Sequence, residues 1–189
     1  RAPDRTFVGA TMPGLPALII GRTEDLAWGV TYAFMDATDS WVEECKDGKY
    51  RRFVDGSDVW EPFTERKAVI KRKNSTHEVT FWENHHGILD GDPNEEGRYL
   101  ATSWAPRHGS GAASIAAFMG LFRASDTKQA MTLSSHIETA WNWVFADKND
   151  SIGYQMSGRM PARNDGKSGF VPLDGADPQN DWQGWITPD

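Results

Sequence analysis

The sequence has one cysteine, no long apolar run and no excess of basic residues. Cys45 is the single cysteine among 189 residues, which excludes an internal disulfide framework and a zinc site built from cysteines. No apolar stretch approaches the ~18 residues that cross a bilayer as a helix. The 20 Lys and Arg are outnumbered by 27 Asp and Glu, for a net charge of −7. This balance argues against a nucleic-acid partner or an anionic membrane surface, since both require basic patches.

The remaining composition is typical of a globular domain. Hydrophobic residues make up 39% of the chain and charged residues 25%, and the length corresponds to about one domain. The chain opens on Arg1-Ala-Pro-Asp and stops at Asp189, after an aromatic stretch. We therefore expect residues 1–189 to form one partial domain, an internal piece of a longer polypeptide.

Hydrophobic patterning predicts a strand-rich first part, two helices and a return to strands. Apolar, β-branched and aromatic segments predict strands over residues 15–20, 27–34, 40–45, 50–54, 68–72, 78–82, 98–104, 141–146 and 152–156. Apolar residues at helical spacing predict a helix over 112–123, and Ser125 is the expected N-cap of a second helix. This order of elements indicates the α+β class.

Candidate nucleophiles have simpler structural interpretations. No Gly-x-Ser-x-Gly motif occurs. Ser125-Asp-Thr-Lys128 has the spacing of a Ser-x-x-Lys pair but is more typical of a helix cap. Acidic neighbours such as Glu43 and Glu44 raise the pKa of a thiol, so Cys45 is expected to be structural.

Histidine and aspartate pairs leave a choice between a metal site and a turn. His85 and His86 are adjacent, and in an extended segment they would point to opposite faces, so a turn at His86-Gly87 is preferred to a shared metal ion. Asp36 and Asp39 follow a predicted strand, and their carboxylates could converge on Ca²⁺, which takes oxygen ligands. Aspartate is also common in turns that bind nothing.

The nine tryptophans are many for a chain of this length. Exposed indole rings in a row would indicate a face that stacks on sugars. Large aromatic residues more often pack the core of a β-rich protein and its edges. No regular exposed row is evident, so core packing is the preferred interpretation.

Several segments, taken in order, resemble the penicillin acylase family of N-terminal nucleophile hydrolases. The most specific is Ala27-Trp-Gly-Val-Thr-Tyr-Ala-Phe-Met-Asp-Ala-Thr-Asp39, followed by Trp41 and Glu43. It is similar to the strand, oxyanion turn and calcium loop of the family's catalytic β-subunit. Further similar segments are 13–21, 86–89, 91–93, 142–147, 151–154, 158–163, 171–175 and 181–186. Together they span nearly the whole chain.

The resemblance implies a fold and a division of the chain. The fold would be a strand-rich fragment of the αββα sandwich of these hydrolases, with a small lobe of strands and helices. Residues 1–45 would hold a core-sheet hairpin and the oxyanion and calcium turn. Residues 46–140 would form the lobe, first strands and then helices. Residues 141–189 would return to the core sheet and end in an irregular tail.

The resemblance also implies a reaction. In this family a Ser exposed at the β-subunit N-terminus attacks an amide carbonyl, and its own α-amino group, which titrates near ~8, acts as the base. A main-chain N–H and an Asn side chain hold the oxyanion. An acyl-enzyme forms, and water releases the acid. Substrates of the family are β-lactam side-chain amides, as in antibiotic synthesis, or acyl-homoserine lactones, which are quorum signals.

Site residues follow from the matching positions. Tyr32 would supply the oxyanion main-chain N–H, and Ile20 and Val30 would line the acyl pocket beside it. A structural calcium would take the carboxylates of Asp36 and Asp39 and the carbonyl oxygens of Thr38 and Pro161. The remaining calcium ligands would come from the α-subunit and from beyond residue 189, so the site in this chain is incomplete.

The family pattern predicts what this chain lacks. The nucleophile Ser would precede Arg1 by a few tens of residues, and the oxyanion Asn would follow Asp189. We therefore expect the chain alone to be inactive, with the α-subunit and the remainder of the β-subunit as its partners. Family members are periplasmic or secreted. The alternative is a non-enzymatic β-rich module that binds calcium or carbohydrate.

Overall fold

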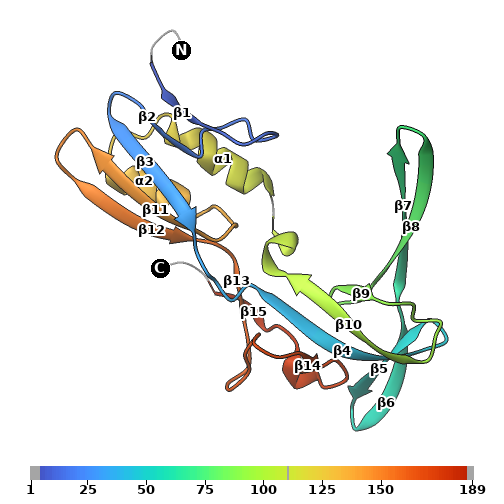
Figure 1. Cartoon of the computed structure of the whole chain (residues 1–189). Coiled ribbons are helices and arrows are strands. Elements are labelled where there is room, and N and C mark those ends of the chain that lie inside the picture. The colour runs from blue at the N-terminus through green and yellow to red at the C-terminus, as the bar shows by residue number, and fades with distance from the viewer. Residues whose placement is uncertain (1–4, 110, 187–189) are drawn as a thin grey trace. The chain divides into compact units, whose positions relative to one another are not determined.

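A computed structural model describes residues 5–109 and 111–186 (Figure 1). The chain forms two compact units that are interleaved in sequence. Unit 1 runs to Asp36 and resumes over Pro106–Met160, and unit 2 comprises Ala37–Ala105 and Pro161–Trp185. Strands predominate and helices are few, which confirms the α+β class. None of the helices in the described part of the chain has the length and apolar character of a membrane span.

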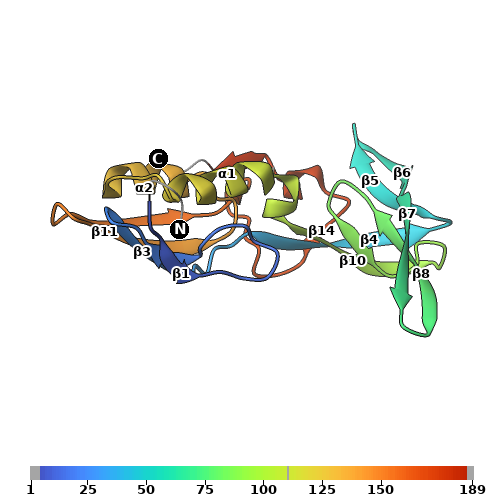
Figure 2. The same ribbon diagram turned by 90° about the horizontal axis from the view of Figure 1, so that it is seen from above.

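Unit 1 is built on a five-stranded antiparallel sheet of order β1-β2-β3-β11-β12. Its elements are β1 Val8–Ala10, β2 Ile20–Arg22, β3 Leu26–Tyr32, α1 Gly111–Leu121, α2 Thr127–Ser134, β11 Trp141–Asp147 and β12 Ile152–Ser157. Figure 2 shows both helices on one side of this sheet. Strand β3, from the predicted segment 1–45, pairs with β11, from the predicted segment 141–189. The helices α1 and α2, from the predicted segment 46–140, belong to the same unit.

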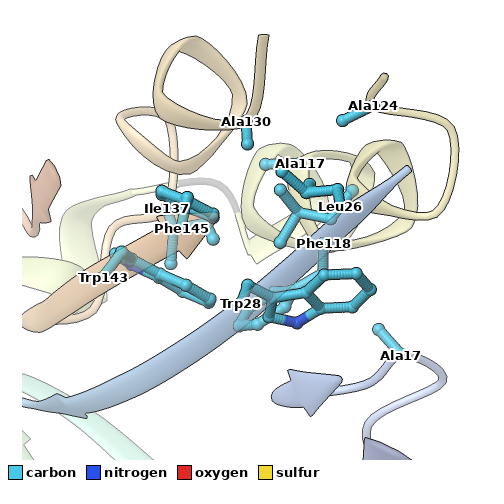
Figure 3. Close-up of a cluster of buried hydrophobic side chains, with 11 residues drawn as sticks. Ala17, Leu26, Trp28, Ala117, Phe118, Ala124, Ala130, Ile137, Trp143 and Phe145 are labelled. Carbon is cyan, nitrogen blue, oxygen red and sulfur yellow. The ribbon is translucent and has the colours of Figure 1, made fainter. Parts of the chain in front are cut away.

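Aromatic side chains fill the space between this sheet and its helices. Trp28 of β3 and Trp143 and Phe145 of β11 are buried, and Phe118 of α1 meets Trp143 edge-on, with ring centroids 5.6 Å apart (Figure 3). Burying a tryptophan removes ~150–250 Å² from water, which corresponds to about 4–6 kcal/mol at ~25 cal/mol per Å². These aromatic residues therefore hold the helices on the sheet.

The opposite face of the same sheet is apolar and exposed. The strand registers place Gly29, Val144 and Tyr154 side by side, and Asn142 beside Met156. Side chains directly opposite each other in an antiparallel pair share one face. Large exposed side chains on this face are Val8 and Ile20 of β1 and β2, Val144 of β11, and Ile152, Tyr154 and Met156 of β12. Exposed apolar side chains thus gather on the face of the sheet that the helices do not cover.

Unit 2 is built on an eight-stranded sheet. The strand order is β6-β5-β4-β10-β9-β8-β7, and β14 pairs with β4 in parallel. The strands are β4 Thr38–Lys46, β5 Lys49–Val54, β6 Ser57–Pro62, β7 Thr64–Arg72, β8 Ser75–Glu83, β9 Ile88–Asp90, β10 Gly97–Trp104 and β14 Leu173–Asp174. Shorter elements are the 3₁₀ turns η1 Ala105–His108 and η2 Pro178–Asn180, and the paired strands β13 Met160–Ala162 and β15 Gly184–Ile186.

Strand β4 carries charged side chains into the interior of unit 2. Asp39, Trp41, Glu43 and Cys45 alternate with more exposed residues and are all buried. Trp41, Glu43 and Cys45 therefore share the buried face of the strand predicted over residues 40–45. Burial, with the nearby Glu43 charge, raises the pKa of the Cys45 thiol to about 12, which makes it an inert structural cysteine.

The predicted start of the first strand and the predicted cap of the second helix were wrong. Residues 15–19 are not a strand, since Pro16 has no N–H for a ladder, and β2 instead begins at Ile20. The N-cap of α2 is Asp126, whose carboxylate accepts the Gln129 N–H at 2.8 Å, and not Ser125. A carboxylate at this position satisfies a free helix N–H and opposes the positive end of the helix dipole.

Candidate functional site

The predicted oxyanion residue lies at the end of a central strand of unit 1. Tyr32 is the last residue of β3, its side chain is exposed, and its ring meets Phe34 edge-on at 5.3 Å. Its carbonyl oxygen accepts the Asn142 side-chain amide at 3.2 Å. The Asn142 amide oxygen in turn accepts the Tyr154 hydroxyl at 2.7 Å. A side-chain amide of β11 therefore reaches the main chain at position 32.

The alternation of main-chain hydrogen bonds between β3 and β11 indicates where the Tyr32 N–H points. The Ala33 N–H donates to Ala140 O, and the Lys148 N–H donates to Asp25 O. The main-chain N–H and C=O groups of odd-numbered residues along β3 therefore point toward β11. Main-chain groups alternate along an antiparallel ladder, and the Tyr32 N–H therefore points to the other side of the strand. On that side the register of β2 with β3 ends at Gly21↔Trp28, before Tyr32 is reached.

The other two predicted pocket residues, Val30 and Ile20, do not lie on the same face of the sheet. Val30 shares the face of Trp28 and packs against the core of unit 1. Ile20 neighbours Gly21, which pairs with Trp28, so alternation assigns Ile20 to the opposite, exposed face. The structure therefore brings Val30 and Tyr32 to one face of the sheet and Ile20 to the other.

An open groove of unit 1 lies away from this trio. Two arginines, Arg5 and Arg123, contribute to its walls, and the trio of Ile20, Val30 and Tyr32 does not. The remaining lining is Phe7, Thr11, Leu15, Pro16, Ala17, Leu18, Met119, Gly120 and Phe122. No motif in the sequence indicates this groove.

The predicted calcium ligands have different surroundings. Asp36 is half-buried and Thr38 exposed, whereas Asp39 and Pro161 are buried. Both oxygens of Asp39 accept from Arg163, at 2.8 and 3.1 Å, and one also accepts from the Trp182 indole. In this arrangement Asp39 forms an ion pair with the Arg163 guanidinium. A divalent cation could bind Asp39 only after Arg163 moves away, since like charges repel. Calcium at these residues stays a prediction.

A charged cluster that the sequence did not predict lies in unit 2, at the loop 84–87. His86 is buried, with its Nδ1 2.7 Å from Glu43 Oε1 and its Nε2 2.8 Å from Asp181 Oδ1. The Asn84 amide also donates to Glu43 Oε1, at 2.7 Å. Arg52 donates to both oxygens of Asp181, at 3.0 and 2.7 Å.

The loop geometry explains why the two histidine rings do not point to opposite faces. Asn84 and Gly87 exchange main-chain hydrogen bonds, and the tight loop between them turns both histidine rings to one side, with centroids 3.8 Å apart. One ring nitrogen each of His85 and His86 and one carboxylate oxygen of Asp181 lie within 4.8 Å of one another. Asp181 Oδ1 already accepts from Arg52 and His86, so the contacts are those of an ion-pair network. The turn predicted at His86-Gly87 is observed.

Tryptophan side chains mostly serve the interior. Trp28, Trp41 and Trp143 are buried, and the exposed ones, Trp60 and Trp104, are 40% and 50% accessible on separate strands. Trp82, Trp141, Trp182 and Trp185 are half-buried. Core packing accounts for this distribution, and no observation favours the alternative of a carbohydrate-binding module.

Comparisons with known proteins agree on what this chain is similar to. The family model described as Penicillin amidase matches residues 1–189. Acyl-homoserine lactone acylase QuiP of Pseudomonas aeruginosa is 30% identical over 100% of the chain, and penicillin G acylase of Escherichia coli is 28% identical over 94% of it. The chain spans 23% and 21% of these two relatives.

A solved structure matches the fold. Thermostable penicillin G acylase from Alcaligenes faecalis superposes on 99% of the chain with a TM-score of 0.85, at 23% sequence identity. The match covers 34% of that protein's chain. At this level of identity the likeness concerns the fold.

Proposed function

Since the chain belongs to the penicillin amidase family, we propose that the protein carrying it cleaves a linear amide in a small molecule. The family resemblance seen in the sequence is confirmed by the family model and by the two acylases that it resembles. The bond would be a β-lactam side-chain amide or the amide of an acyl-homoserine lactone. The protein would be periplasmic or secreted.

The proposed chemistry is acyl transfer through an N-terminal Ser outside this chain. Its hydroxyl adds to the amide carbonyl, its α-amino group takes the hydroxyl proton and passes it to the leaving amine, and water then hydrolyses the acyl-enzyme. The task of this chain is to stabilise the tetrahedral oxyanion. The single observation that carries the proposal is the place of Tyr32 at the end of β3, beyond the last pair of the β2–β3 register, Gly21↔Trp28; ladder alternation would point its N–H to that open side.

The exposed sheet face of unit 1 supports the proposed sandwich. In an αββα architecture one face of each sheet packs on helices and the other on the second sheet. Unit 1 has helices on one face and exposed apolar side chains such as Val144 and Tyr154 on the other. We propose that the α-subunit and the remainder of the β-subunit of the same precursor supply the second sheet.

Calcium belongs to this proposal as a structural ion. Asp36, Thr38, Asp39 and Pro161 would hold it through oxygen atoms once Arg163 releases Asp39, and no step of the reaction passes through the ion. Calcium titration of the full-length protein tests the site. A rise in denaturation temperature that is lost in Asp36→Asn supports it, and an equal rise in the variant places the ion elsewhere.

The function is tested with the matured full-length protein and with this chain alone. The substrates are a phenylacetyl-anilide and acyl-homoserine lactones of several chain lengths, with the released acid measured by mass spectrometry. We expect turnover by the full-length protein, an acyl adduct on its N-terminal Ser, and none from residues 1–189 alone. Failure of the full-length protein on both substrate classes would refute the function, and activity of the isolated chain would refute the external nucleophile.

A further inference from the structure

The contacts of the buried His86 ring indicate how many protons it carries. Glu43 is fully buried and His86 is 2% exposed. Both ring nitrogens of His86 lie within hydrogen-bond distance of a carboxylate oxygen, one from Glu43 and one from Asp181. A carboxylate can only accept, so two ionised partners require a proton on each ring nitrogen.

The charges of the cluster balance only with a cation at His86. Arg52 forms a two-pronged ion pair with Asp181, and these two charges cancel. Glu43 then remains, with no cationic partner except His86 among the contacts that the described residues make to it. Its Oε2 has no hydrogen-bond donor within the described part of the chain. An isolated buried carboxylate is costly unless it is paired.

The aromatic neighbour of His86 also suits a cation. The Trp41 ring lies parallel to the imidazole, with an interplanar angle of 3° and centroids 4.4 Å apart. The face of an indole carries negative electrostatic potential and attracts positive groups. A positively charged imidazole on this face is therefore favoured over a neutral one.

We propose that His86 is a buried, doubly protonated imidazolium that clamps strand β4 to the segment around Asp181, and that loss of one proton in alkaline solution opens this clamp. The clamp ties together three parts of unit 2 that are distant in sequence: β4, the loop 84–87 and the segment that follows η2. It lies outside the groups assigned to acyl transfer, so it does not rest on the proposed function.

The titration directions give the expected pH window. Hydrogen bonds and charges from Asp181 and Glu43 raise the pKa of His86 although burial opposes them, and the histidine and arginine partners hold the pKa of Asp181 well below its usual range although burial opposes them. A raised His pKa stabilises the fold fully below the unfolded value of ~6.5, and this stabilisation is lost as pH rises through the folded pKa. The Asp181 contribution is present above ~3.9 and lost in strong acid.

Charged and titratable groups face this cluster from every element packed on it. They are Glu43 from β4, Arg52 and Tyr50 from β5, Glu61 from β6 through the Tyr50 hydroxyl, His85 from the loop itself and Asp181 after η2. Burial and Glu61 raise the pKa of Tyr50, which keeps the hydroxyl neutral. The alkaline transition is therefore expected from His86.

The test follows the ring nitrogens of His86 in the full-length protein labelled with ¹⁵N-histidine. His86→Gln assigns the signals, Glu43→Gln removes the charge while keeping the shape, and Glu44→Gln is the matched control, since Glu44 is more exposed and pairs with Arg51. We expect both nitrogens protonated at pH 8 in wild type and Glu44→Gln, and one bare nitrogen in Glu43→Gln. A bare nitrogen in wild type, or no effect of Glu43→Gln, means that Glu43 holds the proton and overturns the proposal.

Amide hydrogen exchange tests the clamp itself. After correction for intrinsic rates, protection in β4 and in residues 178–183 should fall at least tenfold as pH rises through the His86 transition. Protection in Glu43→Gln should already be low at pH 7. Protection that does not follow the His86 transition overturns the clamp, and so does Zn²⁺ binding at neutral pH that requires His86, because a metal would replace the proton.

Discussion

At position 32 the main chain and the side chain have separate tasks in the proposed reaction. The main-chain N–H holds the oxyanion, and the ring borders the acyl group. Tyr32→Pro removes the N–H and should lower kcat by ~10²–10³, the usual cost of losing one oxyanion donor. Tyr32→Ala keeps the N–H and should retain kcat within about tenfold while shifting preference toward longer acyl chains. Steady-state kinetics across a series of acyl lengths measures both.

Tyr32→Pro and Tyr32→Ala serve as controls for each other, since one removes the main-chain N–H and the other removes the ring. Proline is tolerated where a strand N–H makes no ladder bond, so Tyr32→Pro should mature and denature like the wild type. Equal kcat in Tyr32→Pro and wild type would remove the N–H from the mechanism. Loss of kcat in Tyr32→Ala would instead assign the role to the ring.

At the level of single residues, the sequence could predict positions that depend on local pattern. Strand alternation places Glu43 on one face of β4 with Trp41 and Cys45, and the structure buries all three. Its partner His86 could not be predicted, because the rule for adjacent residues assumes an extended chain. Nor could Arg163 be matched to Asp39, since pairs this far apart in sequence depend on the tertiary fold.

Among the elements, the loop 84–87 depends on one glycine. Gly87 has φ +149°, and a Cβ there would lie 2.1 Å from the Thr102 carbonyl oxygen of β10. Gly87→Ala should therefore lower the free energy of unfolding by ~2–4 kcal/mol, through backbone strain and displacement of β10. Gly111→Ala is the control, since a Cβ at Gly111 meets nothing within 4 Å and φ is not in the left-handed region. Denaturant unfolding of the full-length variants measures both, and an equal effect would contradict the strain at Gly87.

Element boundaries show what sequence patterns miss. The helix at 112–123 and the strands at 68–72 and 78–82 were predicted from apolar spacing and residue type, and all three exist with shifted ends. Strand β6, Ser57–Pro62, was missed because its residues are mostly exposed and lack an apolar face. Such a strand is specified by its pairing with β5 rather than by its own pattern.

For the whole molecule, the apolar sheet face of unit 1 predicts assembly with the rest of the precursor. Val144 lies at its centre, beside Gly29 and Tyr154, and is 56% exposed. A lysine there would bury an unpaired charge once a second sheet covers the face, which is costly. In the full-length precursor Val144→Lys should reduce the yield of matured, active protein at least tenfold. Val69→Lys on β7 is the matched control, since Val69 is also 56% exposed, and it should mature normally.

The isolated chain gives the opposite expectation for the same substitution. With no second sheet present, the exposed apolar face promotes self-association, and Val144→Lys should make residues 1–189 more soluble and more monomeric in sedimentation. This reversal between the two contexts separates a covered face from a site where lysine simply disrupts the fold. Full maturation of Val144→Lys in the precursor would show that the face remains exposed to water, and the αββα proposal for unit 1 would then be wrong.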